Sequence, residues 1–340
     1  MTGDMRVLVF DGPHQFHIER RPRPRPGPGE VRLRMAYVGI CGSDLHGYTG
    51  ESGRRLPGMI MGHEASGWVE ATGPEVEGLG IGTPVTFNPS LPCDGACGHR
   101  FENHCPVLRV IGVAPDIQGA FADAIVVPAT RVVKLGDLGM LWGAGVEPMA
   151  VALQAARRAR VQPGQDVLVV GGGMIGQSIA QTCRLEGAAS VSVSDPIPAR
   201  RTLARAGGFK ALEPDQVEEA GPFDVSFDAV GITATAYATI QAIPKGAVAC
   251  FVGLGQPEVS IPLFDVVVSE RMIVGSFCYP DAVFEEVRDH LASGRLDLDP
   301  LIGSVESFED TAQAFEDLAS GARTDAKIMM STGLGAPTDA

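Results

Sequence analysis

The chain has 340 residues, and its 45% hydrophobic content is enough for two hydrophobic cores. With 27 basic and 41 acidic side chains, its formal net charge is −14, so it lacks the positive surface that a nucleic-acid partner would need. The chain shows neither an uninterrupted apolar run of the ~18 residues that span a membrane nor an N-terminal signal peptide. Seven cysteines, an odd number without a disulfide pattern, fit a reducing compartment, and we expect a cytoplasmic protein.

Apolar and polar residues alternate in several short runs of the first part of the chain. The alternation predicts β-strands over residues 5–10, 30–38, 65–72, 83–88 and 121–127. Between the first two runs, residues 20–30 (RRPRPRPGPGE) are interrupted by prolines, and we expect them to wrap the surface with their arginines in solvent. The first part of the chain is therefore predicted to form a β-rich domain.

The stretch Val38–Glu64 gathers metal-binding side chains among glycines. A thiolate (Cys41), an imidazole (His63) and a nearby carboxylate suit zinc, whose catalytic sites hold three protein ligands and keep one position open. Taken singly, this cysteine and this histidine are more readily explained as buried core residues. Asp44 changes that balance, because a metal-bound histidine usually donates its other N–H to a carboxylate or a carbonyl.

Ser43 and His46 add a hydroxyl and an imidazole that can carry a proton from a buried site to water. Residues 39–46 (GICGSDLH), followed by residues 62–64 (GHE), resemble the catalytic-zinc signature of the zinc-dependent alcohol dehydrogenases in the medium-chain dehydrogenase/reductase superfamily. The resemblance implies roles for five side chains: zinc ligands Cys41 and His63, the supporting carboxylate Asp44, and the proton relay Ser43 and His46.

Residues 93–105 (CDGACGHRFENHC) resemble a second lobe of that family, in which four cysteines spaced C-x2-C-x2-C-x7-C hold a structural zinc. Cys97 and Cys105 keep the last spacing, but Cys93 is offset and a fourth thiol is missing. A closed site then needs one more ligand, for which the lobe offers Asp94, His99 and His104. The alternative is a lobe without metal.

Residues 142–160 have apolar side chains at helical spacing after Glu147-Pro148, and a proline such as Pro148 suits the start of a helix. Glu147 is also a residue that the helix dipole favours at this end. The pair Glu147-Pro148 resembles the polyol (sorbitol/butanediol) dehydrogenase branch of the family, in which this glutamate approaches the catalytic zinc. By that resemblance Glu64 and Glu147 compete for the third ligand position, and each can serve in turn.

From Gln165 onward strands alternate with helices, which predicts a parallel sheet with crossover helices. Residues 171–176 (GGGMIG) follow a short buried strand and open a helix, and Asp195 ends the next strand. Such glycines let the backbone approach a pyrophosphate at the helix N-terminus. The Asp195 carboxylate suits ribose hydroxyls and repels a 2′-phosphate, which predicts NAD over NADP. The expected cofactor contacts are Gly171, Gly173, Met174, Ile175, Gly176, Asp195 and Arg200, the last of which can soften the preference.

We predict an α/β protein of two domains. By the family resemblance, the C-terminal part of the chain returns to the first domain. Residues 1–146 and 277–340 would then form a β-rich, GroES-like catalytic zinc domain, and residues 147–276 a Rossmann-type NAD-binding domain with a doubly wound parallel sheet. Members of the family are usually dimers or tetramers, which implies a homodimer or a homotetramer.

A zinc site beside an NAD site predicts hydride transfer between NAD(H) and a secondary alcohol or ketone. Glu147-Pro148 favours a polyol, a cyclitol or a vicinal diol, whose second hydroxyl also reaches the metal. Residues 275–279 (GSFCY) resemble a segment that carries Arg before the Tyr in sorbitol dehydrogenases; here that residue is Cys278, which argues against sorbitol itself. The alternatives are a simple secondary alcohol or an amino-alcohol as substrate, and a non-catalytic NAD-binding protein.

Overall fold

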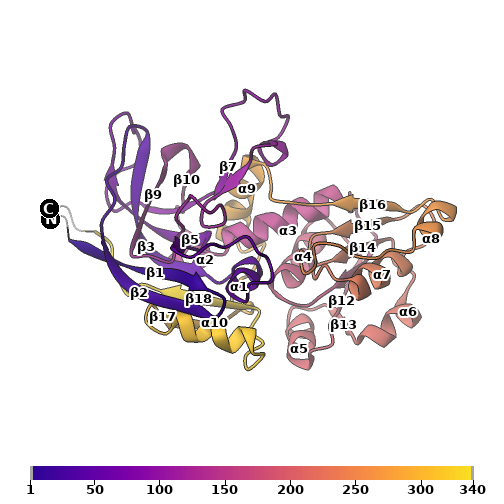
Figure 1. Cartoon of the computed structure of the whole chain (residues 1–340). Coiled ribbons are helices and arrows are strands. Elements are labelled where there is room, and N and C mark those ends of the chain that lie inside the picture. The colour runs from indigo at the N-terminus through magenta and orange to yellow at the C-terminus, as the bar shows by residue number, and fades with distance from the viewer. Residues whose placement is uncertain (1–2, 338–340) are drawn as a thin grey trace.

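The structure is a computed structural model that describes residues 3–337. Figure 1 shows two sheet systems side by side, with helix α3 (Val146–Arg158) between them. One system combines strands from both ends of the chain, and the other is built from the middle of the chain. None of the helices within residues 3–337 has the length and apolarity that crossing a membrane requires.

The first system is built around one seven-stranded sheet. Its strands run in the order β10 (Val132–Lys134), β6 (Pro84–Phe87), β5 (Glu64–Thr72), β3 (Glu30–Gly39), β18 (Lys327–Ser331) and β17 (Ile302–Ser307), with β9 (Ala124–Pro128) paired to β3. Two smaller sheets adjoin it: β2 (Gln15–Pro22), β1 (Asp4–Gly12) and β4 (Met59–Ile60); and β7 (Ser90–Leu91) with β8 (Arg109–Val110). The short helices here are α1 (Gly42–Tyr48), η1 (Glu102–His104), η2 (Ala129–Arg131) and α2 (Met140–Gly143), and α10 (Thr311–Ala319) follows β17.

The outward face of β3 carries an ion cluster that the sequence interpretation missed. Arg32 and Arg34 alternate with buried apolar residues and point away from the core. Together with Arg23 they surround the Glu70 carboxylate at 2.7–2.8 Å. The expectation that the arginines of residues 20–30 are solvated is therefore wrong for Arg23, because a nearly buried carboxylate on β5 recruits it.

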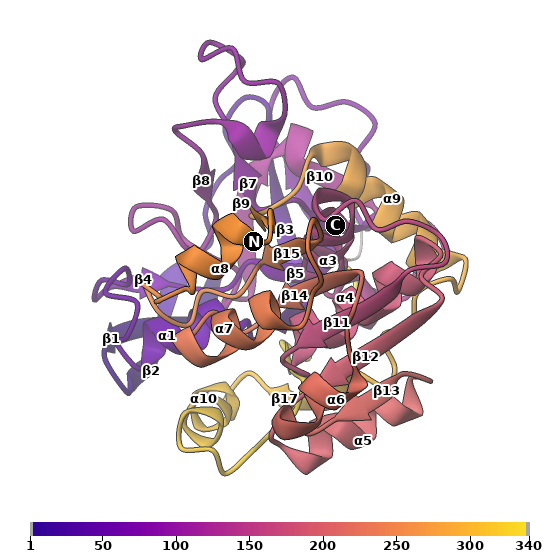
Figure 2. The same cartoon turned by 90° about the vertical axis from the view of Figure 1, so that its right-hand side faces the viewer.

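The second system is a six-stranded parallel sheet, which Figure 2 views from its own side of the molecule. Its order is β13 (Lys210–Leu212), β12 (Ser190–Ser194), β11 (Asp166–Val170), β14 (Val225–Asp228), β15 (Val248–Phe251) and β16 (Met272–Gly275). Its helical segments are α4 (Met174–Leu185), α5 (Pro198–Ala206), η3 (Pro214–Gln216), α6 (Val217–Ala220), α7 (Thr233–Gln241) and α8 (Leu263–Val268), followed by α9 (Asp281–Ala292).

Both faces of the parallel sheet are buried. On β11, Val167 and Val169 pack toward α3 and α4, whereas Leu168 and Val170 pack on the opposite side with residues such as Phe223. A strand covered on both faces is uniformly apolar, which explains the VLVV run in the sequence. The strand order is that of a doubly wound sheet, and the predicted α/β class is confirmed.

The helix predicted to begin near Glu147-Pro148 is present as α3, and residues before it form the separate short helix α2. The chain breaks between the two helices at Gly145, where a Cβ would collide with the Leu298 side chain. Pro148 falls in the first turn of α3, where its missing N–H costs nothing. The break places Glu147 at the start of α3, in the interior between the two sheet systems.

Candidate active site

Cys41, His63 and Glu64 come together where β3 and β5 meet. Cys41 precedes α1 directly, and Glu64 pairs with Gly39 across the two strands. A Cβ at Gly39 would collide with the Glu64 carboxylate, so glycine is required for this approach. One ligand atom from each of the three side chains lies within 4.8 Å of the other two.

This donor set fits zinc. It offers one sulfur, one imidazole nitrogen and one carboxylate oxygen, a combination that borderline-soft zinc accepts. His63 and Glu64 are buried, and Glu64 Oε1 has no hydrogen-bond partner among residues 3–337. A buried carboxylate oxygen without a donor is costly unless a ligand satisfies it, so the cluster is suited to hold a cation.

The other oxygen of Glu64 is occupied by Lys327, a residue that the sequence interpretation missed. The Lys327 ammonium donates to Glu64 Oε2 at 2.5 Å and to the carbonyl of Ile40 at 2.8 Å. Burial lowers the pKa of Lys327, but the charges of Glu64, Cys41 and Glu147 and the hydrogen bond to Glu64 together raise it above its ordinary value. No local motif marks this lysine, which is brought to the site by strand β18.

Asp44 lies fully buried beside His63, as predicted. Its Oδ1 is 3.6 Å from His63 Nδ1 and 3.5 Å from a guanidinium nitrogen of Arg55, another residue that the sequence did not reveal. Burial raises the pKa of Asp44, but the charges of His63 and Arg55 lower this pKa by a larger amount, so the net shift is downward. Asp44 therefore faces the imidazole as an anion, at a distance slightly beyond that of a hydrogen bond.

Glu147 lies near the cluster but is held differently. Its Oε1 accepts a hydrogen bond from the buried Tyr279 hydroxyl at 3.0 Å. Burial is the main cause that raises the pKa of Glu147 to about 7; His63 lowers it and Glu64 raises it. Of the two competing glutamates, Glu64 is the one grouped with Cys41 and His63.

The predicted relay pair is not connected directly. Ser43 Oγ lies 3.4 Å from Cys41 Sγ, whereas His46 Nδ1 bonds to Glu51 at 2.6 Å. The His46 side chain is 39% exposed, so it faces solvent and stands on the outer side of α1. Within residues 3–337 no hydrogen bond joins Ser43 to His46, and a relay through both needs a bridging group between them.

The predicted dinucleotide residues lie at the carboxyl end of β11 and the start of α4. Gly176 approaches the Gly171 carbonyl so closely that a Cβ would clash with it, whereas Gly173 has open space in front of its Cα. That open space at a helix N-terminus suits a pyrophosphate. Met174 and Ile175 form the first turn of α4 behind it.

Asp195 is buried at the end of β12 and already has partners. Its Oδ2 accepts from the Gly172 amide at 2.7 Å, its Oδ1 accepts from the Ile197 amide at 2.7 Å, and Arg200 lies 3.5 Å away. A carboxylate oxygen has a second lone pair, so these bonds leave acceptor capacity for a ribose hydroxyl. The Asp195 carboxylate thus also fixes the glycine turn, a role that the sequence motif does not reveal.

The loop between β7 and β8 brings the thiols of three predicted lobe residues close together: Cys93, Cys97 and Cys105. His99 joins them, with all four ligand atoms within 4.8 Å of one another. Asp94 and His104, the other candidates for a fourth ligand, are not part of this group.

Comparison with known proteins supports the two-part fold. Residues 27–137 match the family "Alcohol dehydrogenase GroES-like domain", and residues 175–293 match "Zinc-binding dehydrogenase". The predicted GroES-like and Rossmann-type parts are confirmed by these matches and by the parallel sheet.

Relatives of similar length are known. The chain is 33% identical to 2-dehydro-3-deoxy-L-galactonate 5-dehydrogenase of Pseudoalteromonas atlantica, over 85% of this chain and 88% of that protein. It is 32% identical to L-idonate 5-dehydrogenase of Vitis vinifera, over 86% and 85%. The crystal structure of 2R,3R-butanediol dehydrogenase from Bacillus subtilis superposes with a TM-score of 0.87 at 26% identity, covering 97% of this chain and 100% of that one.

Proposed function

Because the chain belongs to the zinc-binding dehydrogenase family of the alcohol dehydrogenases, we propose that it transfers a hydride between NAD(H) and a secondary hydroxyl of a polyol, a cyclitol or a vicinal diol. The observation that carries the proposal is the buried group of Cys41, His63 and Glu64, with an unpartnered carboxylate oxygen. When bound there, zinc supplies Lewis-acid activation of the alcohol oxygen.

The surrounding residues have distinct tasks in this proposal. Asp44 orients the imidazole of His63, and Lys327 holds Glu64 in place through its second oxygen. Glu147, whose pKa lies at about 7, is suited to bind a substrate hydroxyl and to exchange a proton with it near neutral pH. Tyr279 fixes the carboxylate of Glu147 for that task.

Cys278 contributes an uncharged side chain near Glu147. Burial raises the pKa of its thiol to about 12, with Glu147 adding to the shift, so the side chain is neutral at physiological pH. A neutral side chain at this position favours an uncharged polyol over a sugar acid, whose carboxylate needs a cationic partner. Some relatives are named for sugar-acid substrates, so sugar acids belong in the test.

The test is a substrate panel with zinc-loaded enzyme and NAD, in which NADH formation is followed. We expect polyols and vicinal diols to exceed monohydric secondary alcohols in kcat/KM by about tenfold, because a second hydroxyl bond in the transition state contributes about 1.4 kcal/mol. A higher kcat/KM for sugar acids or for 2-propanol would overturn the substrate assignment. Retention of full turnover by Cys41→Ser would refute the zinc role, and NAD binding without turnover of any alcohol would support the non-catalytic alternative.

The chain is further expected to have defined domain boundaries, a symmetric oligomeric state and a cytoplasmic location. Domain boundaries near residues 146 and 277 are supported by the start of α3 and the end of β16, and limited proteolysis followed by mass spectrometry tests them. A homodimer or homotetramer is expected, and light scattering on the purified chain measures it. A cytoplasmic location agrees with free thiols at the site, and fractionation of the source cells checks it.

A further inference from the structure

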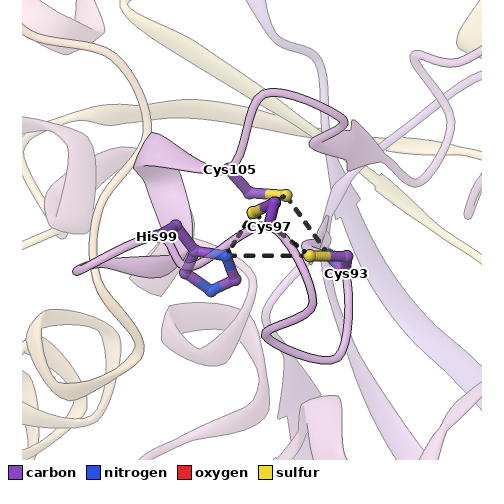
Figure 3. Close-up of side chains that lie close together, drawn as sticks. All are labelled: Cys93, Cys97, His99 and Cys105. Atoms are coloured by element: carbon purple, nitrogen blue, oxygen red, sulfur yellow. Dashed lines mark hydrogen bonds between the residues drawn. The ribbon is translucent and has the colours of Figure 1, made fainter.

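Four side chains of the loop between β7 and β8 point toward one centre, apart from the active site (Figure 3). Cys97 Sγ lies 3.3 Å from Cys93 Sγ, 3.8 Å from Cys105 Sγ and 3.0 Å from His99 Nδ1, and Cys93 Sγ lies 3.8 Å from the same nitrogen. A zinc tetrahedron with bonds of about 2.0–2.3 Å has ligand-to-ligand edges of roughly 3.3–3.8 Å. The observed separations scatter around those edges.

Competing explanations for the cluster fit less well. A disulfide requires sulfur atoms about 2.05 Å apart and leaves no role for a histidine, whereas His99 Nδ1 faces two thiols here. The other two candidate ligands are engaged elsewhere: Asp94 accepts from the Ala96 amide at 3.2 Å, and the His104 ring packs edge-on against Phe101.

We propose that Cys93, Cys97, His99 and Cys105 bind one zinc ion in a closed site, and that the loaded loop holds residues 277–281 in position. The ligand order, C-x3-C-x-H-x5-C, differs from the four-cysteine spacing of the family. His99 replaces the missing thiol, which the sequence alone left open among three residues.

The link to residues 277–281 runs through η1, the turn that Cys105 closes by donating its amide to the Glu102 carbonyl. Asn103 Nδ2 donates to the Phe277 carbonyl at 3.0 Å, and Glu102 Oε2 accepts from the Asp281 amide at 3.3 Å. Both ends of the segment are thus attached to the turn beside the metal site. Between them lies Tyr279, which holds Glu147. This second half of the inference rests on the proposed function of Glu147; the metal site does not.

The first experiment is elemental analysis of the purified, zinc-reconstituted full chain and four variants. We expect about two zinc ions per chain in wild type, about one in His99→Ala and in Cys41→Ala, and about two in His99→Cys and in the matched control His104→Ala. Cobalt-loaded Cys41→Ala should show the intense sulfur-to-cobalt absorption of a thiolate site, and this absorption should be lost when His99→Ala is added.

Two zinc ions per chain in His99→Ala would overturn the metal site. The same holds if wild type binds only one zinc ion and its loop cysteines, Cys93, Cys97 and Cys105, either react with an alkylating reagent in the native state or form a disulfide. Failure of the proposed function is distinguishable, because Cys41→Ala should lose turnover and still keep the zinc of the loop.

The second experiment is amide hydrogen exchange across residues 277–281. We expect exchange in this segment to accelerate about tenfold or more in His99→Ala, to return to the wild-type rate in His99→Cys, and to stay unchanged in His104→Ala. Asn103→Ala should accelerate exchange in the same segment while zinc content stays at the wild-type value. Unchanged exchange in both His99→Ala and Asn103→Ala would show that the loop does not position the segment.

Discussion

Lys327 and Glu64 form a buried ion pair of 2.5 Å at the edge of the candidate zinc site, although 263 residues separate them in the chain. The lysine side chain is 2% exposed and the glutamate side chain 1%, so neither charge is stabilised by water. The ammonium therefore fixes one oxygen of Glu64 and leaves Oε1 free for the metal. Through this pair the last strand of the chain contributes to a site whose ligands come from its first part.

Replacing Lys327 by Met should destabilise the zinc-free protein by about 3 kcal/mol, because a buried carboxylate is left without its counter-charge. Zinc should recover part of this loss, since a cation at Glu64 supplies the missing charge. Urea denaturation with and without zinc measures both effects. Lys245 is exposed, and Lys245→Met is the matched control. An equal loss of stability in Lys327→Met and Lys245→Met would contradict a stabilising role of the Lys327–Glu64 ion pair.

The stability contributed by Glu147 should depend on pH. Burial raises its pKa from 4.5 to about 7, so the folded protein binds this proton more tightly than the unfolded chain does. The contribution is full below pH 4.5 and is lost as the pH rises through about 7, a loss of about 3 kcal/mol. As the pH rises from 4.5 to about 7, the free energy of unfolding of chelator-treated wild type should fall relative to that of chelator-treated Glu147→Gln. Glu285 is exposed, and Glu285→Gln should show the same pH dependence of the free energy of unfolding as wild type. A difference between wild type and Glu147→Gln that does not change with pH would show that the pKa of Glu147 is ordinary.

Glu70 should show the opposite pH dependence. Burial raises its pKa, but the hydrogen bond from Arg34 and the charges of Arg23 and Arg32 lower it more, so the net shift is downward. Its contribution is present above pH 4.5 and lost as the pH falls through the lowered value. Glu70→Gln should cost about 2 kcal/mol at pH 7 in thermal or urea unfolding, and the gap to wild type should narrow in acid.

A matched control for Glu70 is Glu77→Gln, which removes an exposed carboxylate. We expect its free energy of unfolding to change by less than about 0.5 kcal/mol. A gap between Glu70→Gln and wild type that stays constant down to pH 3 would contradict a lowered pKa for Glu70.

Removal of the Asp44 charge should weaken zinc binding without removing a ligand. Asp44→Asn loses the anion that faces His63, and such supporting carboxylates are worth about 10–100-fold in metal affinity. Competition against a coloured chelator measures the affinity of the protein for the active-site zinc. All proteins compared carry His99→Ala, so that the loop site does not contribute to the titration. The exposed Asp137→Asn should leave the affinity unchanged, and a wild-type affinity in Asp44→Asn would exclude the orienting role.

Asp195 should set the preference for NAD. Its carboxylate lies beside Gly172 at the cofactor turn and repels a 2′-phosphate, so wild type should favour NAD over NADP in kcat/KM by at least about tenfold, or 1.4 kcal/mol. Asp195→Asn should narrow this ratio, because the amide is neutral and keeps one acceptor oxygen for the Ile197 amide. The exposed Asp215→Asn carries the same charge change and should leave the ratio unaltered. A wild-type preference for NADP would refute the assignment.

The sequence by itself determined much of this protein. The parallel sheet follows from uniformly apolar runs such as residues 167–170, whose side chains are buried on both faces of the sheet. The segment 171–176 identified the turn before α4, because its glycines and the helix after them are neighbours in the chain. Cys41 and His63 were recognisable for the same reason: each lies in a short run whose residue types and spacing are local.

Only the tertiary structure decided which side chains complete these sites. Lys327 reaches Glu64, and Tyr279 reaches Glu147, only because distant parts of the chain return to the same place, and no local pattern encodes that return. The fourth member of the loop cluster was open among three residues until the loop geometry selected His99. Local periodicity reports which face of an element is buried, whereas the partner of a buried charge or a metal is set by packing between elements remote in sequence.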